Sequence, residues 1–243
     1  MTSTAENTSQ RNATLHIADL HAWYGESHVL HGVDMTVRPG EVVTLLGRNG
    51  AGRSTTLKCI MGLLDKRSGS IRIDGTEMIG ARPDQIARKG LGYCPEERGI
   101  FASLTTEENL LLPPEIAPGG IAVDELYRMF PNLLERRNSP GTRLSGGEQQ
   151  MLALARILRS GARLLLLDEI SEGLAPVIVQ ALGRTIRKLR ELGYTIIMVE
   201  QNFRFAAPLT DRFYLMEHGS IVETFQASEL SSQMATLNSH LGI

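Results

Sequence analysis

The chain has 243 residues, of which 42% are apolar and 21% charged, so it has the composition of a globular protein and not of a wholly disordered one. Its 25 basic and 27 acidic residues give a net charge of −2, which does not support non-specific binding to nucleic acid. No apolar run approaches the roughly 20 residues of a bilayer-spanning helix, so we expect any role at a membrane to require docking onto other subunits.

The first elements predict a polar tail followed by a β-rich region. Residues 1–12 contain no apolar stretch, and we expect a disordered tail there and not a signal peptide. One domain is then predicted over residues 13–243. Residues 14–20 and 33–37 read as strands of antiparallel type, and residues 41–46 (EVVTLL) as a short buried strand.

A glycine-rich segment follows this strand and has the pattern of a phosphate-binding loop. Its glycines let backbone N–H groups curl around phosphate oxygens, and the helix expected over residues 54–64 points its positive end at the same charge. A glycine-rich turn without any ligand is the alternative. The candidate ATP-binding residues here are Gly47, Arg48, Asn49, Gly50, Ala51, Gly52, Arg53, Ser54 and Thr55.

Two positions of this loop carry most of its chemistry. Ser54 supplies a hydroxyl for Mg²⁺. Arg53 departs from the pattern, because lysine is expected there. Arginine still neutralises phosphate charge, but its planar fork must meet the phosphate oxygens in a different geometry from the point charge of lysine.

The middle of the chain changes from short strands to helices. A strand is expected at residues 70–73 and another ends at residues 92–93, just before Pro95 and Glu96. Residues 97–155 then read as a helical insertion, with helical composition over 104–112 and 123–137 and a strong helix over 146–160.

The remaining elements predict an α/β core. Residues 163–168 (RLLLLD) read as a second buried parallel strand, residues 176–192 as a helix, and residues 194–199 as a further strand. Alternating strands and helices imply right-handed crossovers and a mostly parallel sheet. The two cysteines, Cys59 and Cys94, form no CxxC pair, and we expect reduced thiols.

The most specific motif is LSGGEQQ at residues 144–150, which is the signature of ABC ATPases, and the chain resembles that family from about residue 14 onward. The resemblance implies a P-loop NTPase of ABC type, an α/β fold with a mostly parallel sheet core, an antiparallel β subdomain and a helical subdomain at about residues 97–155. It also implies that Ser145, Gly146 and Gly147 close on the γ-phosphate held by another protomer. The alternative is a capped helix with turn glycines.

The same resemblance gives roles to the acids after the second buried strand and to the switch region. It implies that Asp168 holds Mg²⁺ and that Glu169 polarises the attacking water. Gln201 stands where the family usually has histidine, so it can donate a hydrogen bond to the γ-phosphate but cannot titrate. The alternatives are a strand that ends in solvated acids and an ordinary loop glutamine.

Two further positions are implied by the family pattern. An aromatic residue at Tyr24 would stack on adenine, with Trp23 less suited, and the alternative is a tyrosine in a surface turn. Glu96 occupies the place of the Q-loop glutamine and would reach Mg²⁺ or water, whereas the alternative is a solvated turn acid.

Several of the departures from the family pattern, Glu96 and Gln201 among them but not Arg53, occur together in one branch of the family. PEERGIF, LSGGEQQMLALAR, DE-x-SEGLAP and VEQN resemble the ATP-binding subunits of branched-chain amino-acid uptake systems, above all the smaller of their two ATPases. Related systems for urea or short amides have similar subunits. ATP and Mg²⁺ are the implied cofactors.

This resemblance also implies the partners and the location. A second ABC ATPase, identical or homologous, would pair with this one on two membrane permeases, and a periplasmic solute-binding protein would deliver the solute. The chain would then be peripheral, at the cytoplasmic face of the inner membrane, with no nucleic-acid partner.

Two other functions are alternatives: a soluble ABC ATPase of DNA repair or translation, and a nucleotide-binding regulator. A soluble ABC ATPase of DNA repair is disfavoured because only 144 − 54 = 90 positions separate Ser54 from Leu144, which leaves no room for long coiled coils. An ATPase of translation usually has two such domains in one chain. A nucleotide-binding regulator with weak or no hydrolysis would follow from Arg53, although the retained Glu169 and LSGGE argue for turnover.

Overall fold

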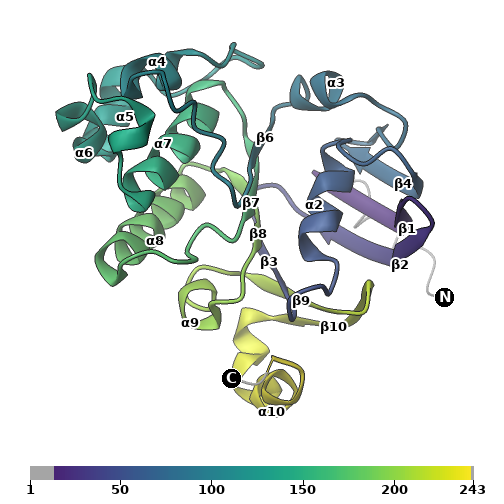
Figure 1. Cartoon of the computed structure of the whole chain (residues 1–243). Coiled ribbons are helices and arrows are strands. Elements are labelled where there is room, and N and C mark those ends of the chain that lie inside the picture. The colour runs from purple at the N-terminus through teal and green to yellow at the C-terminus, as the bar shows by residue number, and fades with distance from the viewer. Residues whose placement is uncertain (1–13, 242–243) are drawn as a thin grey trace.

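The computed structural model describes residues 14–241, so the tail expected at residues 1–12 lies outside the described part. Two sheets and a group of helices make up the molecule (Figure 1). The strands are β1 (Leu15–Tyr24), β2 (Ser27–Val37), β3 (Val42–Leu46), β4 (Arg67–Ile73), β5 (Thr76–Glu77), β6 (Leu91–Cys94), β7 (Leu164–Asp168), β8 (Thr195–Val199), β9 (Arg212–Glu217) and β10 (Ser220–Gln226). The α-helices are α2 (Arg53–Ile60), α3 (Pro83–Ala87), α4 (Thr106–Leu111), α5 (Val123–Met129), α6 (Pro131–Glu135), α7 (Gly146–Arg159), α8 (Pro176–Glu191), α9 (Phe203–Ala206) and α10 (Leu230–Leu241), with 3₁₀ turns at Gly141–Arg143 and Ala227–Glu229.

The larger sheet has the strand order β10-β9-β3-β8-β7-β6. All its neighbouring pairs are parallel except β9 and β10, so the mostly parallel core predicted from the sequence is confirmed. Because parallel strands end on the same edge, the loops after β3, β7 and β8 gather there, and this is where ligands bind in open α/β sheets. The smaller sheet, β2-β1-β4-β5, is antiparallel throughout, as expected for the β subdomain.

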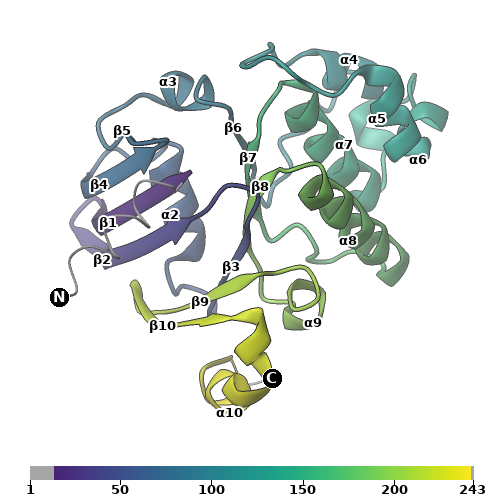
Figure 2. The ribbon, with the colours of Figure 1, turned by 180° about the vertical axis from the view of Figure 1, so that it is seen from behind.

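The larger sheet separates two apolar cores. Leu164 and Leu166 of β7 face a core that contains α2 and the antiparallel sheet, whereas Leu165 and Leu167 face a core built from α5 to α8. Figures 1 and 2 show α4 to α8 on one side of the sheet and the antiparallel strands with α2 and α3 on the other. This alternation follows from the pleat of a strand, whose successive side chains point to opposite faces.

Several predicted helices have different bounds in the structure. The helix predicted at residues 54–64 ends at Ile60, because Gly62 has a positive φ of 71°. The helix predicted at 123–137 is divided at Phe130, since Pro131 starts a new helix and has no N–H to continue the old one. The helical region extends to Arg159, the end of α7, beyond the expected limit near residue 155.

The C-terminal hairpin was not predicted. Strand β9 pairs with β3 on the side opposite β8, and β10 adds an antiparallel edge strand. Phe213, Phe225 and Leu237 build a third, smaller core that joins this hairpin to α10. The hairpin therefore places β3, the strand before the phosphate loop, in the interior of the sheet.

Within residues 14–241, no helix combines the length and the apolar character that crossing a bilayer would take.

Cys59 and Cys94 are buried free thiols, and burial raises the pKa of each to about 12. Neither thiol is therefore ionised at neutral pH.

Candidate functional site

The phosphate loop, residues 47–54, links the end of β3 to the start of α2. Gly50 and Gly52 have φ values of 80° and 107°, in a region that side-chain-bearing residues rarely adopt. A Cβ atom at Gly47 would lie 2.4 Å from the carbonyl oxygen of Met216 in β9. Glycine is thus required at these positions by backbone conformation and by close packing.

An open pocket of about 350 Å³ lies at this loop. Residues 49–55 form one part of its lining, and one valine, three glutamates and one glutamine from other elements form the rest. Those other lining residues are Val29, Glu96, Glu169, Glu172 and Gln201. The structure therefore brings the phosphate loop together with three of the residues that the sequence predicts for catalysis and metal binding.

Ser54 and Asp168 meet at the edge of this pocket. The Ser54 hydroxyl donates a hydrogen bond of 2.8 Å to Asp168 Oδ1, and the hydroxyl of Tyr93 donates one of 3.0 Å to Asp168 Oδ2. Asp168 is only 2% exposed, and this burial raises its pKa. Hydroxyl and carboxylate oxygens are ligands that Mg²⁺ prefers, so this pair fits the predicted metal role. Tyr93 was not foreseen, because a tyrosine inside a strand carries no signal for such a contact.

Glu169 is held at both carboxylate oxygens. Arg53 Nη2 donates to Oε1 at 2.8 Å, and Gln201 Nε2 donates to Oε2 at 2.9 Å. Burial raises the pKa of Glu169 to about 7, with a further increase from the carboxyl group of Glu172, while Arg53 and Gln201 act in the opposite direction. A carboxyl group with a pKa near neutrality suits a proton acceptor.

Arg53 is itself buried, with 4% exposure, and its fork is used by protein groups. Besides Glu169, it reaches the backbone carbonyl of Glu200 through Nη1 at 2.9 Å and Asn49 Oδ1 through Nη2 at 3.3 Å. Burial lowers the pKa of Arg53, and the surrounding acids counteract this. The hydrogen bonds of the Arg53 guanidinium orient it across the pocket toward Glu169, the acid that follows β7.

Glu96 belongs to a group of three acids at the same pocket. One carboxylate oxygen from each of Glu96, Glu169 and Glu172 lies within 4.8 Å of the others. The sequence predicted Glu96 as a metal ligand but gave no role to Glu172. Glu96 and Ser54 both line this pocket, whereas Asp168 does not line it and is connected to it through its hydrogen bond to Ser54.

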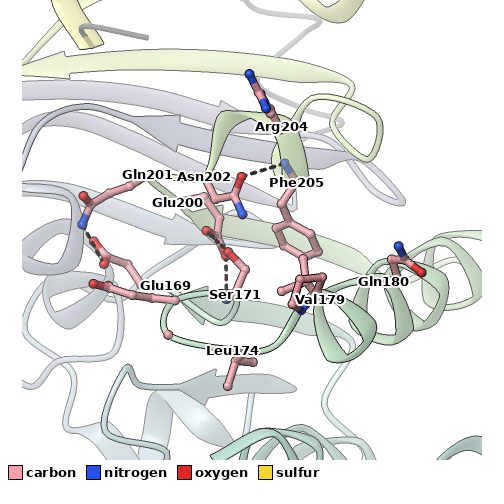
Figure 3. Close-up of a pocket in the computed structure, with 13 residues that line it drawn as sticks. Glu169, Ser171, Leu174, Val179, Gln180, Glu200, Gln201, Asn202, Arg204 and Phe205 are labelled. Carbon is pink, nitrogen blue, oxygen red and sulfur yellow. Dashed lines mark hydrogen bonds between the residues drawn. The ribbon is translucent and has the colours of Figure 1, made fainter.

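A second hollow, of about 850 Å³, adjoins the first, and Glu169, Glu172 and Gln201 line both. Figure 3 shows this hollow, with Gln201 bonded to Glu169 and with Ser171 bonded to Glu200. The loops after β7 and β8 thus form a common wall between the two spaces.

The signature residues lie at the start of α7. Ser145 caps this helix, because its hydroxyl accepts from the N–H of Glu148 at 3.3 Å and the Glu148 carboxylate accepts from the N–H of Ser145 at 2.7 Å. A Cβ atom at Gly147 would lie 2.8 Å from Ile178 of α8, so the glycine permits close helix packing. Among the residues that the structure describes, neither Ser145, Gly146 nor Gly147 lines the pocket at the phosphate loop.

Tyr24, the residue predicted to stack on adenine, lies at the tip of the β1–β2 hairpin. Tyr24 is 46% exposed there, and one face of its neighbour Trp23 is stacked on His28 at a ring separation of 4.5 Å. Trp23 is thus engaged within the sheet, while the ring of Tyr24 is available. Stacking of Tyr24 on adenine stays a prediction.

Comparisons with known proteins show which proteins this chain is similar to. The family model described as "ABC transporter" matches residues 30–172. The chain is 42% identical to the high-affinity branched-chain amino acid transport ATP-binding protein BraG of Pseudomonas aeruginosa, over 90% of this chain and 96% of that protein. It is 35% identical to a probable branched-chain amino acid transport ATP-binding protein, LivF, of Archaeoglobus fulgidus, over 89% and 93% of the two chains.

A third relative has a different described role. The lipopolysaccharide export system ATP-binding protein LptB of Haemophilus influenzae is 32% identical, with 90% of this chain and 93% of that protein covered. Among solved structures, a nucleotide-free ATP-binding cassette from an ABC transporter superposes with a TM-score of 0.82 at 20% identity, covering 94% of this chain and 97% of that one. An ATP-binding subunit of an ABC transporter gives a TM-score of 0.77 at 29% identity, with coverage of 91% and 93%.

Proposed function

This chain belongs to the ABC transporter family as an ATP-binding, ATP-hydrolysing subunit, and from that premise we propose that it energises the import of branched-chain amino acids. The observation that carries the substrate class is the 42% identity to BraG over 96% of that protein's length. The motifs PEERGIF and VEQN support the same branch of the family.

The roles proposed for the site residues follow from the contacts at the phosphate loop. Bound Mg²⁺ would neutralise phosphate charge, with Ser54 and Asp168 as its protein ligands and Glu96 as a further oxygen donor. Glu169 would accept the proton of the attacking water, since burial raises its pKa to about 7. Gln201 would orient Glu169 and the γ-phosphate through its amide.

The signature is proposed to complete the site of another subunit. Ser145, Gly146 and Gly147 stand at the N-terminus of a 14-residue helix, where backbone N–H groups and the helix dipole favour an anion. Because they lie away from the phosphate loop of their own chain, the supporting geometry is one in which two ATPase subunits enclose the nucleotide. We further propose two membrane permeases as partners, docking at the cytoplasmic face of the membrane.

ATP turnover tests the catalytic part of this proposal. The chain, assembled with its permeases in lipid vesicles, should hydrolyse ATP, and Glu169→Gln should abolish this activity while ATP still binds. Turnover in the unmutated assembly that does not exceed the Glu169→Gln control would contradict the proposal.

Solute uptake tests the substrate class. Vesicles that contain the assembly and its solute-binding protein should accumulate radiolabelled leucine, isoleucine or valine in an ATP-dependent manner. Uptake of urea or a short amide in their place would move the function to the related systems, and extraction of lipopolysaccharide from the vesicles would agree with the similarity to LptB.

One observation favours a second function, a nucleotide-binding regulatory subunit with weak or no hydrolysis. The fork of Arg53 is occupied by Glu169 and by the carbonyl of Glu200, so ATP must compete with the proposed base for this cation. A strong ion pair of this kind would slow the chemical step. Tight ATP binding combined with turnover no higher than that of Glu169→Gln would identify this function.

A further inference from the structure

Glu200 is a buried acid to which the proposed reaction gives no role. It follows β8 directly and is only 1% exposed, and burial raises its pKa to about 7. Burying a carboxyl group is costly unless both of its oxygens are hydrogen-bonded. The groups that donate hydrogen bonds to the Glu200 carboxylate therefore indicate which segment this residue holds in place.

Both oxygens of Glu200 bind a single residue. The backbone N–H of Ser171 donates to Oε1 at 3.1 Å, and the Ser171 hydroxyl donates to Oε2 at 2.7 Å (Figure 3). Ser171 is itself only 4% exposed. We call these two hydrogen bonds the Glu200–Ser171 clasp.

The clasp fixes one end of a strained turn. Glu169, two residues before Ser171, has a φ of 48°, a left-handed conformation that is unfavourable for a non-glycine residue. On the other side of the turn, the N–H of Glu169 donates to the carbonyl of Val199 at 2.9 Å. The backbone around Glu169 is thus bound at both ends to consecutive residues, Val199 and Glu200, at the end of β8.

The same segment also contacts the Glu169 side chain. Gln201, the residue after Glu200, donates to Glu169 Oε2, and Arg53 is bound to both the Glu200 carbonyl and Glu169 Oε1. Loss of the clasp would free the turn after Glu169 while these side-chain contacts remained. The carboxylate would then lose the backbone support that aims it at the phosphate loop.

We propose that Glu200 is a positioning residue for ATP hydrolysis, which acts through Ser171 to hold Glu169 in its left-handed conformation. This inference rests on the proposed role of Glu169 as proton acceptor. Glu200 is not among the residues that line the pocket at the phosphate loop, and it touches that lining through its backbone carbonyl, which accepts from Arg53 and is kept in every side-chain substitution. Its removal should therefore reduce the rate of the chemical step and leave ATP affinity unchanged.

Three substitutions in the full-length chain distinguish the effect of losing the two hydrogen bonds of the clasp from the effect of losing the charge of Glu200. Glu200→Ala removes both hydrogen bonds, and Ser171→Ala removes the one made by the hydroxyl. Glu200→Gln keeps both, because its amide oxygen accepts from the Ser171 N–H and its amide nitrogen donates to the hydroxyl oxygen. We expect kcat to fall roughly 10- to 100-fold in Glu200→Ala, to fall less in Ser171→Ala and to stay within about threefold in Glu200→Gln, with KM for ATP nearly constant.

Glu41→Ala is a matched control for the loss of a buried carboxylate. Glu41 precedes β3 at the opposite end of the sheet, where it accepts from the N–H of Arg38 at 2.8 Å and from Arg212 Nη2 at 2.7 Å. This variant should lower the thermal unfolding temperature and keep the kcat of the folded fraction. An unchanged kcat in Glu200→Ala, or a Glu200→Gln variant as slow as Glu200→Ala, would overturn the proposal.

Amide hydrogen exchange tests the clasp independently of turnover. The Ser171 N–H should exchange much faster in Glu200→Ala than in the unmutated chain or in Glu200→Gln. Unchanged exchange in Glu200→Ala would overturn the clasp even if that variant hydrolysed ATP more slowly. Absence of turnover in the unmutated chain, with exchange as expected here, would instead reject the proposed function and leave the clasp as a structural feature.

Discussion

At the scale of single residues, Arg53 is the clearest departure from the expected phosphate loop. Its fork divides between Glu169 and the carbonyl of Glu200, which a lysine amine with one charged nitrogen could not span in the same way. We expect Arg53→Lys to preserve or raise ATP turnover, because lysine would leave Glu169 freer to act on water. Steady-state kcat and KM for ATP measure this.

The opposite result would be equally informative. A complete loss of turnover in Arg53→Lys, with ATP still bound, would mean that the site is built for the arginine fork. The ion pair with Glu169 would then be part of the active arrangement and would not compete with it.

Glu200 gives a second prediction at this scale, for stability against pH. Burial raises its pKa from an ordinary 4.5 to about 7, so the folded protein binds this proton more tightly than the unfolded chain does. The resulting stabilisation is complete below pH 4.5 and is lost as the pH rises through about 7. Glutamine does not titrate, so Glu200→Gln should become more stable relative to the unmutated chain between pH 5 and 8, by roughly 1–3 kcal/mol.

Urea unfolding midpoints at several pH values measure this difference. A stability difference that stays constant from pH 5 to pH 8 would contradict the assigned burial of an ionisable Glu200. Glu41→Gln is unsuitable as a control here, because Arg212 forms an ion pair with that acid.

The residues of the phosphate loop could be predicted because their pattern is local. Gly47–Ser54 are consecutive, and the strand and helix around them have strong signals of their own. Ser171 and Glu200 are 29 positions apart, and only the pairing of β7 with β8 brings their loops together. A buried acid next to Gln201 has no signature in the sequence, and the same holds for the contact of Tyr93 with Asp168.

At the scale of elements, two helices offer a matched test of the signature serine. Ser145 caps α7 and Thr105 caps α4, each in a capping box with a glutamate three residues later. Ser145→Ala and Thr105→Ala should each lower the free energy of unfolding by about 0.5–2 kcal/mol. Only Ser145→Ala should also reduce ATP turnover, because only Ser145 belongs to the proposed nucleotide site.

Thermal unfolding and ATPase assays on the same preparations measure both effects. If Thr105→Ala reduced ATP turnover as much as Ser145→Ala, the loss of turnover in Ser145→Ala would be explained by the loss of a helix cap alone. The alternative interpretation of the signature, as an ordinary capped helix, would then be favoured.

The elements differ in how far the sequence reveals them. Helix α7 and strand β7 were predicted well, because α7 has a clear apolar periodicity and β7 is a continuous run of leucines before an acid. The division between α5 and α6 at Phe130 depends on one proline, and the broad helical composition obscured it. The β9–β10 hairpin was missed because its pairing with β3 joins segments about 170 residues apart, for which no local pattern exists.

At the scale of the whole molecule, the separation of signature and phosphate loop predicts complementation. In a symmetric dimer of this chain, each nucleotide site takes its phosphate loop from one copy and its signature from the other. Mixing Ser145→Ala chains, whose turnover is reduced, with inactive Glu169→Gln chains should place both defects in one site of a mixed dimer and none in the other. Random pairing with independent sites should then restore roughly a quarter of the unmutated turnover.

ATPase assays on mixtures at several ratios measure this recovery. Mixtures that stay inactive at all ratios, although mixed dimers form, would contradict a dimer of identical chains. Pairing with a homologous second ATPase would then be favoured.

The two leucine-rich faces of β7 have a consequence for how Asp168 should be studied. Every residue of β7 and β8 is buried, and alternate side chains enter two different apolar cores, so a slip by one residue would exchange the cores without exposing any leucine to water. The hydrophobic pattern alone therefore cannot set the alignment of these strands. Polar contacts at the ends of the two strands can fix this alignment. The hydrogen bonds of Asp168 to Ser54 and Tyr93 are among these contacts. Removing Asp168 would thus remove contacts that align the strands of the sheet together with a proposed metal ligand, so a defect in that variant would not report on metal binding alone.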